Sequence, residues 1–307
     1  MNTWTVSFAI LLTCAGGVAC GQTRPTITGI SNMGIYSTDL RKTEQFFVHD
    51  LGAFKAPDPQ NPKGVRFYFN RLQFVEVLPL PVGPPSVNRF DHVGFTTSNA
   101  EGMRSYLAAH GVATPAAVTV GSDGSRYFDV LDPEGNRVQF VQPPAHPLKV
   151  PVNPLSDHII HVGYMVHNAT TEDRFYRALL GFRPYWRGGM KDGDTDWISM
   201  QVPNGTDWIE YMMVKGPETK GIPPTVSLQA LGSMDHFSLG VQNMEKTADV
   251  LYAEDRFSPR HSPMQLGRDG KWQLNLYTPD DTRVEFMEFQ PSVKPCCSPF
   301  LLPSPTK

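Results

Sequence analysis

The sequence predicts an α+β protein built from four copies of one small βαβββ module. Three features recur in the same order along the chain: an alternating stretch typical of a strand, a segment with helical spacing of apolar residues, and a closing strand. The chain has 307 residues, 40% of them hydrophobic, which is enough for two domains of about 140 residues each. We therefore expect two domains with two modules in each.

Each copy opens with a stretch in which apolar side chains alternate, as in a strand with one buried face. The openings start at Asn32, His92, His161 and His236, and read NMGIY, HVGFT, HVGYM and HFSLG. Because these stretches are alike, equivalent positions can be compared between copies.

A helix is expected after each opening, because apolar residues then recur at three- and four-residue spacing. Three of the four helices should end at a glycine, which readily adopts the left-handed conformation of a helix C-terminus. These glycines are Gly52, Gly111 and Gly181. The apolar stripe of each helix should pack on the sheet.

Each copy closes with an alternating strand. These strands read FVEV from Phe74, RVQF from Arg137, WIEY from Trp208 and RVEF from Arg283. Turn-forming residues at 132–135 and 278–281 precede two of them. Proline-rich stretches separate the copies at 78–85, 143–154 and 216–224.

The openings, the helix end FYRALLGF at 175–182 and the closing strands make the chain resemble the vicinal oxygen chelate superfamily. That superfamily includes glyoxalase I, methylmalonyl-CoA epimerase, extradiol dioxygenases and bleomycin-resistance proteins. The resemblance covers residues 27 to 291 and is more specific for fold than for reaction. It implies that paired modules form two open barrels, an N-terminal domain at 27–143 and a C-terminal domain at 155–291.

The resemblance also implies metal ligands on the first and last strand of each module. In the C-terminal domain these are His161, Glu210, His236 and Glu285, with the same 49-residue separation from 161 to 210 and from 236 to 285. Strand alternation distinguishes them from their neighbours, since only residues an even number apart share a face. His158 and Glu288 should therefore point away from the site.

The N-terminal domain has Asn32, Glu76, His92 and Gln139 at the corresponding positions. Two of these are weak or neutral ligands, so we expect a degenerate site without a working metal. Glu76 and His92 are then expected to pair with each other. The domain would have a structural or substrate-shaping role.

Two imidazoles and two carboxylates suit a divalent ion such as Zn, Ni, Co, Mn or Fe(II), and the sequence does not choose among them. Such an ion polarises two neighbouring oxygens of a substrate and stabilises an enolate. The resemblance to glyoxalase I implies that Glu210 or Glu285 moves the proton as a catalytic residue. The expected activity is a glyoxalase-like lyase or isomerase reaction.

Two alternatives stay open. The first is an extradiol-type dioxygenase, which would bind iron through His161, His236 and Glu285 and whose four-module layout fits the chain. Two features argue against it: Glu210 would be a fourth ligand, and the strand of Glu210 has no histidine for the acid-base role. His261 is expected to be a loop residue. The second alternative is a non-catalytic binding protein of the bleomycin-resistance kind, which would use the cleft without metal.

The aromatic residues of these strands are expected to belong to the core, so no functional role is assigned to them. They are Tyr164, Trp186, Trp197, Trp208 and Tyr211.

The partner should be a small molecule, because a net charge of −3 with scattered Lys and Arg favours neither nucleic acid nor membrane insertion. The oligomeric state stays open.

Residues 1–22 are expected to be a signal segment, with an uncharged apolar run from Trp4 to Ala19. A secreted or periplasmic location follows, with lipidation at Cys20 as an alternative. The proline-rich tail at 292–307 is expected to be disordered, with Cys296 and Cys297 as incidental thiols.

Overall fold

The structure is a computed structural model that describes residues 23–82, 89–214 and 232–306. The expected signal segment, including Cys20, lies outside the described residues. Within the described ranges, the helices are too short or too polar to cross a membrane.

The N-terminal domain contains the first two modules. The first consists of β1 (Ile27–Ser37), α1 (Leu40–Gln45) continued by the π-helical turn η1 (Phe46–Asp50), β2 (Phe54–Pro57), β3 (Val65–Tyr68) and β4 (Phe74–Pro79). The second consists of β5 (Phe90–Thr97), α2 (Ala100–Ala109), β6 (Thr119–Val120), β7 (Arg126–Leu131) and β8 (Arg137–Gln142). Both have the predicted βαβββ order.

The C-terminal domain repeats this arrangement. The third module consists of β9 (Ile159–Val166), α3 (Ala169–Asp173) continued by η2 (Arg174–Leu179), β10 (Arg183–Gly188), β11 (Trp197–Gln201) and β12 (Trp208–Met213). The fourth consists of β13 (His236–Val241), α5 (Met244–Ala253), β14 (Gln265–Leu266), β15 (Trp272–Tyr277) and β16 (Arg283–Glu288).

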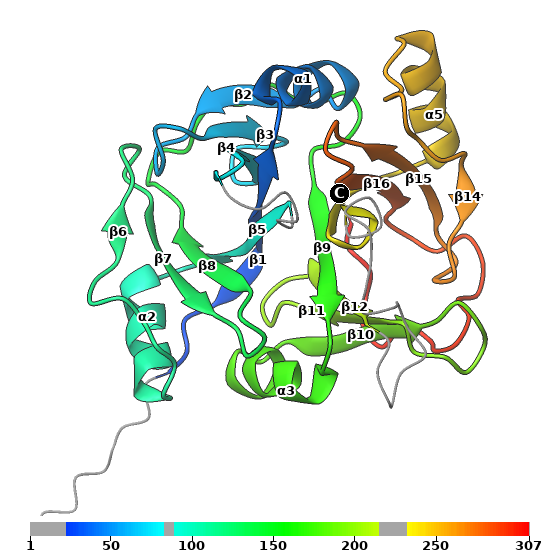
Figure 1. Cartoon of the computed structure of the whole chain (residues 1–307). Helices are drawn as coiled ribbons and strands as arrows, with labels where there is room; N and C mark the ends of the chain where they lie inside the picture. The colour runs from blue at the N-terminus through cyan, green and yellow to red at the C-terminus, as the bar shows by residue number, and fades with distance from the viewer. Residues whose placement is uncertain (1–22, 83–88, 215–231, 307) are drawn as a thin grey trace, which may run out of the picture.

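The strands form two curled eight-stranded sheets that lie side by side (Figure 1). Their orders are equivalent, β2-β3-β4-β1-β5-β8-β7-β6 and β10-β11-β12-β9-β13-β16-β15-β14. In each sheet the two modules meet through their first strands, which pair antiparallel, and each first strand runs parallel to the last strand of its own module. The structure confirms the predicted fold of four modules in two open half-barrels.

The helices α1, α2, α3 and α5 begin with the same local chemistry, and the first three are followed by a glycine. All four start after an Asp or Asn whose side chain accepts a hydrogen bond from the backbone N–H three residues later, which satisfies an otherwise unpaired donor. These caps are Asp39, Asn99, Asn168 and Asn243. The predicted C-terminal glycines have positive φ angles of 68°, 81° and 78°.

A shared core lies between the two sheets. Strand alternation places Val162, Tyr164 and Val166 of β9 in this core, on the face opposite to that of His161. Elements of one domain pack on the other, as in the stacking of Phe47 from η1 on Phe237 from β13, with ring centroids 6.3 Å apart. The expected ligand positions are therefore on the faces that the shared core leaves open.

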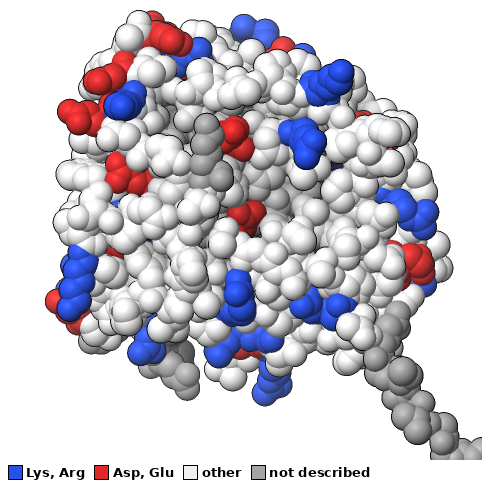
Figure 2. All heavy atoms as spheres, turned by 180° about the vertical axis from the view of Figure 1, so that it is seen from behind, with Lys and Arg blue, Asp and Glu red and all other residues white. Residues whose placement is uncertain are grey.

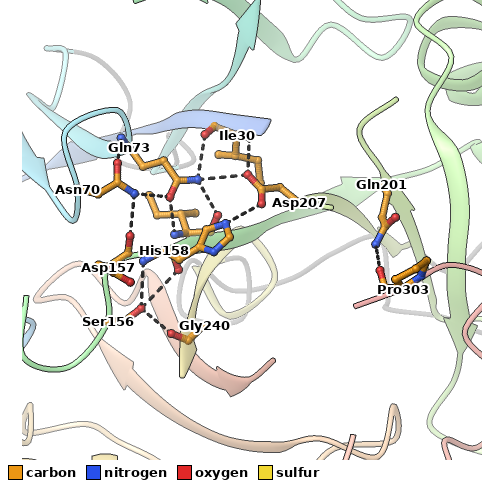
Figure 3. Close-up of polar contacts among 11 residues, drawn as sticks. Ile30, Asn70, Gln73, Ser156, Asp157, His158, Gln201, Asp207, Gly240 and Pro303 are labelled. Atoms are coloured by element: carbon orange, nitrogen blue, oxygen red, sulfur yellow. Dashed lines mark hydrogen bonds and ion pairs between the residues drawn. The ribbon is translucent and has the colours of Figure 1, made fainter. Parts of the chain in front are cut away.

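A buried polar network also joins the domains (Figure 3). Gln73 of the N-terminal domain accepts a hydrogen bond from the Ile159 N–H at 2.9 Å and donates to the Ile159 carbonyl at 2.9 Å. Asp207 accepts from the Ile30 N–H at 2.9 Å and contacts His158 Nε2 at 2.7 Å. Because these contacts hold β1 against β9, they fix the two sheets relative to each other.

The tail is ordered, so the expectation of disorder was wrong. The ring of Phe300, in the tail, packs on the ring of Tyr185 with centroids 4.8 Å apart, and Cys296 and Cys297 form a disulfide. Local composition does not reveal this packing, because the surface that receives the tail is formed by β10 and becomes available only in the folded domain.

Backbone hydrogen bonds hold the tail in place along its length. The Leu301 N–H donates to the Tyr185 carbonyl at 2.9 Å, and Gln201 Nε2 donates to the Pro303 carbonyl at 2.7 Å (Figure 3). The segment therefore forms part of the C-terminal domain.

The charged side chains are spread over the face of the molecule that Figure 2 shows. Most of the red Asp and Glu side chains lie at the upper left and centre of this view, several blue Lys and Arg side chains lie near its lower edge, and uncharged surface separates many of them.

Candidate metal centre

The structure brings all four expected ligands together on the concave face of the C-terminal sheet. His161 lies on β9, Glu210 on β12, His236 on β13 and Glu285 on β16. The two imidazole Nε2 atoms are 3.0 Å apart. Glu210 Oε2 lies 3.8 Å from His236 Nε2, and Glu285 Oε2 lies 3.4 Å from His161 Nε2.

The pairing of the strands produces this convergence. Glu210 and His236 both lie opposite Gly163, whereas His161 and Glu285 both lie opposite Ser238. The two modules therefore contribute their ligands in the same register. A Cβ at Gly163 would come within 2.1 Å of the His236 ring, so glycine leaves the space that this imidazole occupies.

Neighbouring groups orient the side chains of the cluster. His236 Nδ1 donates to the Met234 carbonyl at 2.6 Å, so its Nε2 lone pair faces the site. The His161 ring stacks on Trp208 with centroids 4.7 Å apart, and Ser199 Oγ donates to Glu210 Oε1 at 3.1 Å. Contacts of this kind hold metal ligands in position.

Two neighbouring candidates, His158 just before β9 and Glu288 at the end of β16, point elsewhere. His158 contacts Asp207 in the network between the domains. Glu288 Oε1 accepts a hydrogen bond from the Met244 N–H at the start of α5, 2.9 Å away. The structure thus places both side chains outside the cluster, where each has another partner.

Burial controls the protonation of the cluster. It holds the pKa values of both imidazoles, His161 and His236, well below their usual range, so both are neutral at physiological pH. Burial, followed by the nearby Glu285 carboxylate, raises the pKa of Glu210 to about 8. Burial also raises the pKa of Glu285 to about 7, against the opposing effect of Arg283.

These residues fit a divalent ion. One ligand atom each from His161, Glu210 and His236 lie within 4.8 Å of one another, and two neutral imidazoles with two carboxylates are a donor set used by such ions. The 3.0 Å between the Nε2 atoms is what two nitrogens about 2.1 Å from one ion adopt at a right angle. A bound cation would also favour the ionised forms of both carboxylates.

A cavity of about 350 Å³ opens onto Glu210 and Glu285. Its aromatic walls are formed by Tyr185, Trp186, Trp197, Trp208 and Phe300, and methionines 190, 212 and 287 add further apolar surface. Polar side chains that line it are Ser199, Gln265, Arg268, Asp269, Gln273 and Arg283. Such a cavity suits a small ligand with an apolar body and few polar groups.

The aromatic residues to which the sequence assigned no role divide into two groups. Tyr164 and Tyr211 belong to the shared core, but three tryptophans line the cavity. Alternation could have identified Trp208, which lies two residues before Glu210, and Arg283, which lies two residues before Glu285. Phe300 had no comparable signal, because it reaches the cavity from the tail.

Lys271 is a fully buried amine beside the site. Its Nζ lies 4.7 Å from the Trp208 ring centroid and 3.3 Å from the Tyr185 hydroxyl. Burial lowers its pKa to about 8, partly offset by nearby carboxylates, of which Asp269 has the largest effect. The sequence analysis did not identify this residue.

In the N-terminal domain, the histidine equivalent to His236 is His92, and other side chains form hydrogen bonds with both of its ring nitrogens. The amide of Asn32 lies 2.6 Å from His92 Nε2, and His92 Nδ1 lies 2.8 Å from Asp91 Oδ2. Glu76 is within 3.6 Å of His92, as their expected pairing requires, and Arg137 forms an ion pair with Asp91. Because both imidazole nitrogens have hydrogen-bond partners, an ion would have to displace one of them.

A family model, the Glyoxalase/Bleomycin resistance protein/Dioxygenase superfamily, matches residues 158–290. A search of curated protein sequences gave no match.

Solved structures of dioxygenases share the whole fold. Homoprotocatechuate 2,3-dioxygenase from Brevibacterium fuscum, solved with 3,4-dihydroxyphenylacetate, is 17% identical with a TM-score of 0.59, covering 87% of this chain and 82% of that one. The 2,3-dioxygenase LapB from Pseudomonas sp. KL28 is 14% identical with a TM-score of 0.60, covering 89% and 97%. A catechol 2,3-dioxygenase is 12% identical with a TM-score of 0.60, covering 92% and 96%.

At these identities the similarity shows the fold and not the reaction. The sequence match to the superfamily covers the C-terminal domain, at residues 158–290. The whole chain has the fold of the two-domain, four-module proteins with which it was compared.

Proposed function

We propose that the protein is a metal-dependent enzyme that binds a small substrate through two adjacent oxygens and catalyses a glyoxalase-like lyase or isomerase reaction. The observation that carries this proposal is the position of Glu210, which reaches the same point as the two imidazoles and so adds a carboxylate to the cluster. A second carboxylate, Glu285, lies across the cluster beside His161.

The divalent ion would supply Lewis acidity toward the two adjacent oxygens of the substrate. His161, His236, Glu210 and Glu285 would hold it. The aromatic walls of the cavity orient the substrate and exclude water from its reacting carbon. Oε2 of Glu210, or of Glu285, is at the cavity floor and can take the proton from that carbon and return it to a neighbouring one.

A second candidate is an extradiol-type dioxygenase that uses His161, His236 and Glu285. It is favoured by the fold, because the dioxygenases described above have the same two-domain arrangement. Against it, the described residues that line the cavity walls include no histidine that could exchange protons with the substrate. His261, which pairs with Leu276 in an isolated β-bridge rather than lying in a plain loop, donates its Nδ1 proton to the Ser258 carbonyl and does not line the cavity.

Two measurements test this proposal against its alternatives. We expect purified protein to contain a stoichiometric divalent metal, and a protein that binds none would support a non-catalytic binding function of the bleomycin-resistance kind. We then expect no oxygen uptake when Fe(II)-loaded protein is mixed with catechols. Rapid oxygen consumption with ring cleavage would instead establish the dioxygenase.

We also propose that the protein is exported, on the basis of the uncharged apolar run that ends near Ala19. N-terminal sequencing of the native protein should find a start close to Cys20. An intact Met1 in protein isolated from cytosol would contradict export.

A further inference from the structure

The two domains contain an arginine at the same position. Arg137 on β8 and Arg283 on β16 each lie two residues before the last expected ligand position, which is Gln139 in one domain and Glu285 in the other. In the N-terminal domain carboxylates neutralise this arginine. Arg137 forms ion pairs with Asp91 and with Asp129, the latter at 3.6 Å.

In the described part of the C-terminal domain, neither of the two equivalent positions holds a carboxylate that pairs with Arg283. The position of Asp129, opposite the last ligand position in the neighbouring strand, is occupied by Asn275, whose amide donates to Ser262 Oγ at 3.2 Å. The counterpart of Asp91 is Asp235, and its Oδ1 accepts a hydrogen bond from the Met165 N–H at 3.1 Å.

Arg283 is consequently left with unused hydrogen-bonding capacity at the cavity. Its Nη1 is 4.0 Å from Glu285 Oε1, beyond hydrogen-bond distance, and its buried Nε has no hydrogen-bond partner among the described residues. The other arginine in the cavity wall, Arg268, is already engaged. Its Nε donates to the Gly189 carbonyl at 3.1 Å, and its Nη2 pairs with Asp192.

The charges of the site point to an anionic partner. A divalent ion would be balanced by the ionised carboxylates of Glu210 and Glu285, because imidazoles bind metal ions in their neutral form. Lys271 and Asp269 carry opposite charges. The carboxylate nearest to Arg283 is that of Glu285, 4.0 Å away, and it already balances the ion. Arg283 therefore adds one formal positive charge to the site, and an uncompensated charge that is largely removed from water is unfavourable. A monoanionic ligand would complete the balance.

We propose that Arg283 binds the negatively charged group of the substrate, and that the substrate is a monoanion with adjacent oxygens, specifically a carboxylate next to a hydroxyl or oxo group. The aromatic walls would receive an apolar substituent. A guanidinium presents several N–H donors in a plane and matches a carboxylate. This inference rests on the proposed function, because the charge balance includes the ion.

Calorimetric binding of two matched probes to Zn(II)-loaded protein tests this assignment. Mandelate has a carboxylate beside a hydroxyl on an aromatic ring, and mandelamide is its neutral analogue. We expect the wild type to bind mandelate at least about tenfold more tightly than mandelamide, a discrimination that corresponds to about 1.4 kcal/mol. Arg283→Gln should lose most of this preference through weaker mandelate binding, and Arg283→Lys should retain part of it. Arg268→Gln removes a cavity arginine that is already paired and should retain the preference.

Metal content, measured on every variant, separates the possible failures. A wild type that binds no metal would overturn the proposed function itself. A metal-loaded wild type without a preference for mandelate, or an Arg283→Gln protein that keeps both its metal and the full preference, would overturn the role of Arg283 alone. If the Arg268→Gln and Arg283→Gln proteins lost the preference for mandelate to the same extent, the role of Arg283 would also be overturned, because the loss would then reflect a general effect of charge.

Discussion

Glu285 and Glu288 are three residues apart on one strand, and their contacts show why they should differ in function. Glu285 lies 3.4 Å from His161, whereas Glu288 accepts a hydrogen bond from the backbone of α5. We expect Glu285→Ala to lose most of the bound metal and activity, and Glu288→Ala to retain both. Metal analysis of the purified variants checks this.

The reverse result, with metal lost only in the Glu288→Ala protein, would show that the strand register is wrong. Glu210→Ala provides a further comparison, because we expect it to weaken metal binding as well. If that variant kept full metal and activity, the three-ligand dioxygenase would become the better account.

The raised pKa values of the two carboxyls predict how metal binding depends on pH. Burial raises the pKa of Glu210 to about 8 and of Glu285 to about 7, above the ordinary value of 4.5. In the ion-free protein, their contribution to stability is therefore present at low pH and is lost as the pH rises through about 7 and 8.

A divalent ion displaces these protons, so metal affinity should increase from about pH 6 to about pH 8 and level off above that range. Calorimetry in buffers with different ionisation enthalpies should detect proton release at pH 7. Affinity that is constant over this range, without proton release, would contradict the protonated state of the ion-free site.

The alternation of side chains along a strand explains which site residues could be predicted from the sequence and which could not. It distinguished His161 from His158 because the choice depends only on the distance along one strand. The same rule, applied two residues further, reaches Trp208 and Arg283. Tyr185 could not be found in this way, because a register irregularity between Pro184 and Trp186 interrupts the alternation of β10.

At the scale of elements, repetition made the modules predictable. The four openings and closings became first and last strands, because short alternating segments encode a strand with one buried face. The tail was not predictable, since it has no regular structure of its own and is held by contacts to β10 and β11. Its order depends on residues more than 100 positions away in the sequence.

Phe300 should be the residue through which the tail contributes most to stability. Its ring packs on Tyr185 and Trp186 and forms part of the cavity wall. Phe300→Ala should lower the free energy of unfolding by about 2 kcal/mol, less than for a fully buried ring. Chemical denaturation measures this change.

Leu301→Ala is the matched control, because its side chain is 63% exposed and its backbone hydrogen bond to Tyr185 survives the substitution. We expect a change within about 0.5 kcal/mol. Equal effects of the two substitutions would show that the ring of Phe300 does not anchor the tail.

For the whole molecule, the two sheets show how one arrangement of strands accommodates different sets of side chains. Glu76 and His92 lie opposite Gly34, in the same register in which Glu210 and His236 lie opposite Gly163. In the N-terminal domain, however, Asn32 and Gln139 replace an imidazole and a carboxylate. The duplicated fold therefore preserves the geometry in both domains and the complete donor set in one.

The Gln73 network, shown in Figure 3, keeps the two domains in one orientation. The two sets of ligand positions lie on separate sheets of this single body. Because only the C-terminal domain has the complete donor set, we expect a single ion for each chain, bound in that domain. A crystal of the metal-loaded protein, measured at the absorption edge of the metal, locates the ion directly. We predict one anomalous peak bonded to His161 Nε2 and His236 Nε2, with carboxylate oxygens of Glu210 and Glu285 beside it. The absence of that peak, or an equal peak at His92, would contradict the account.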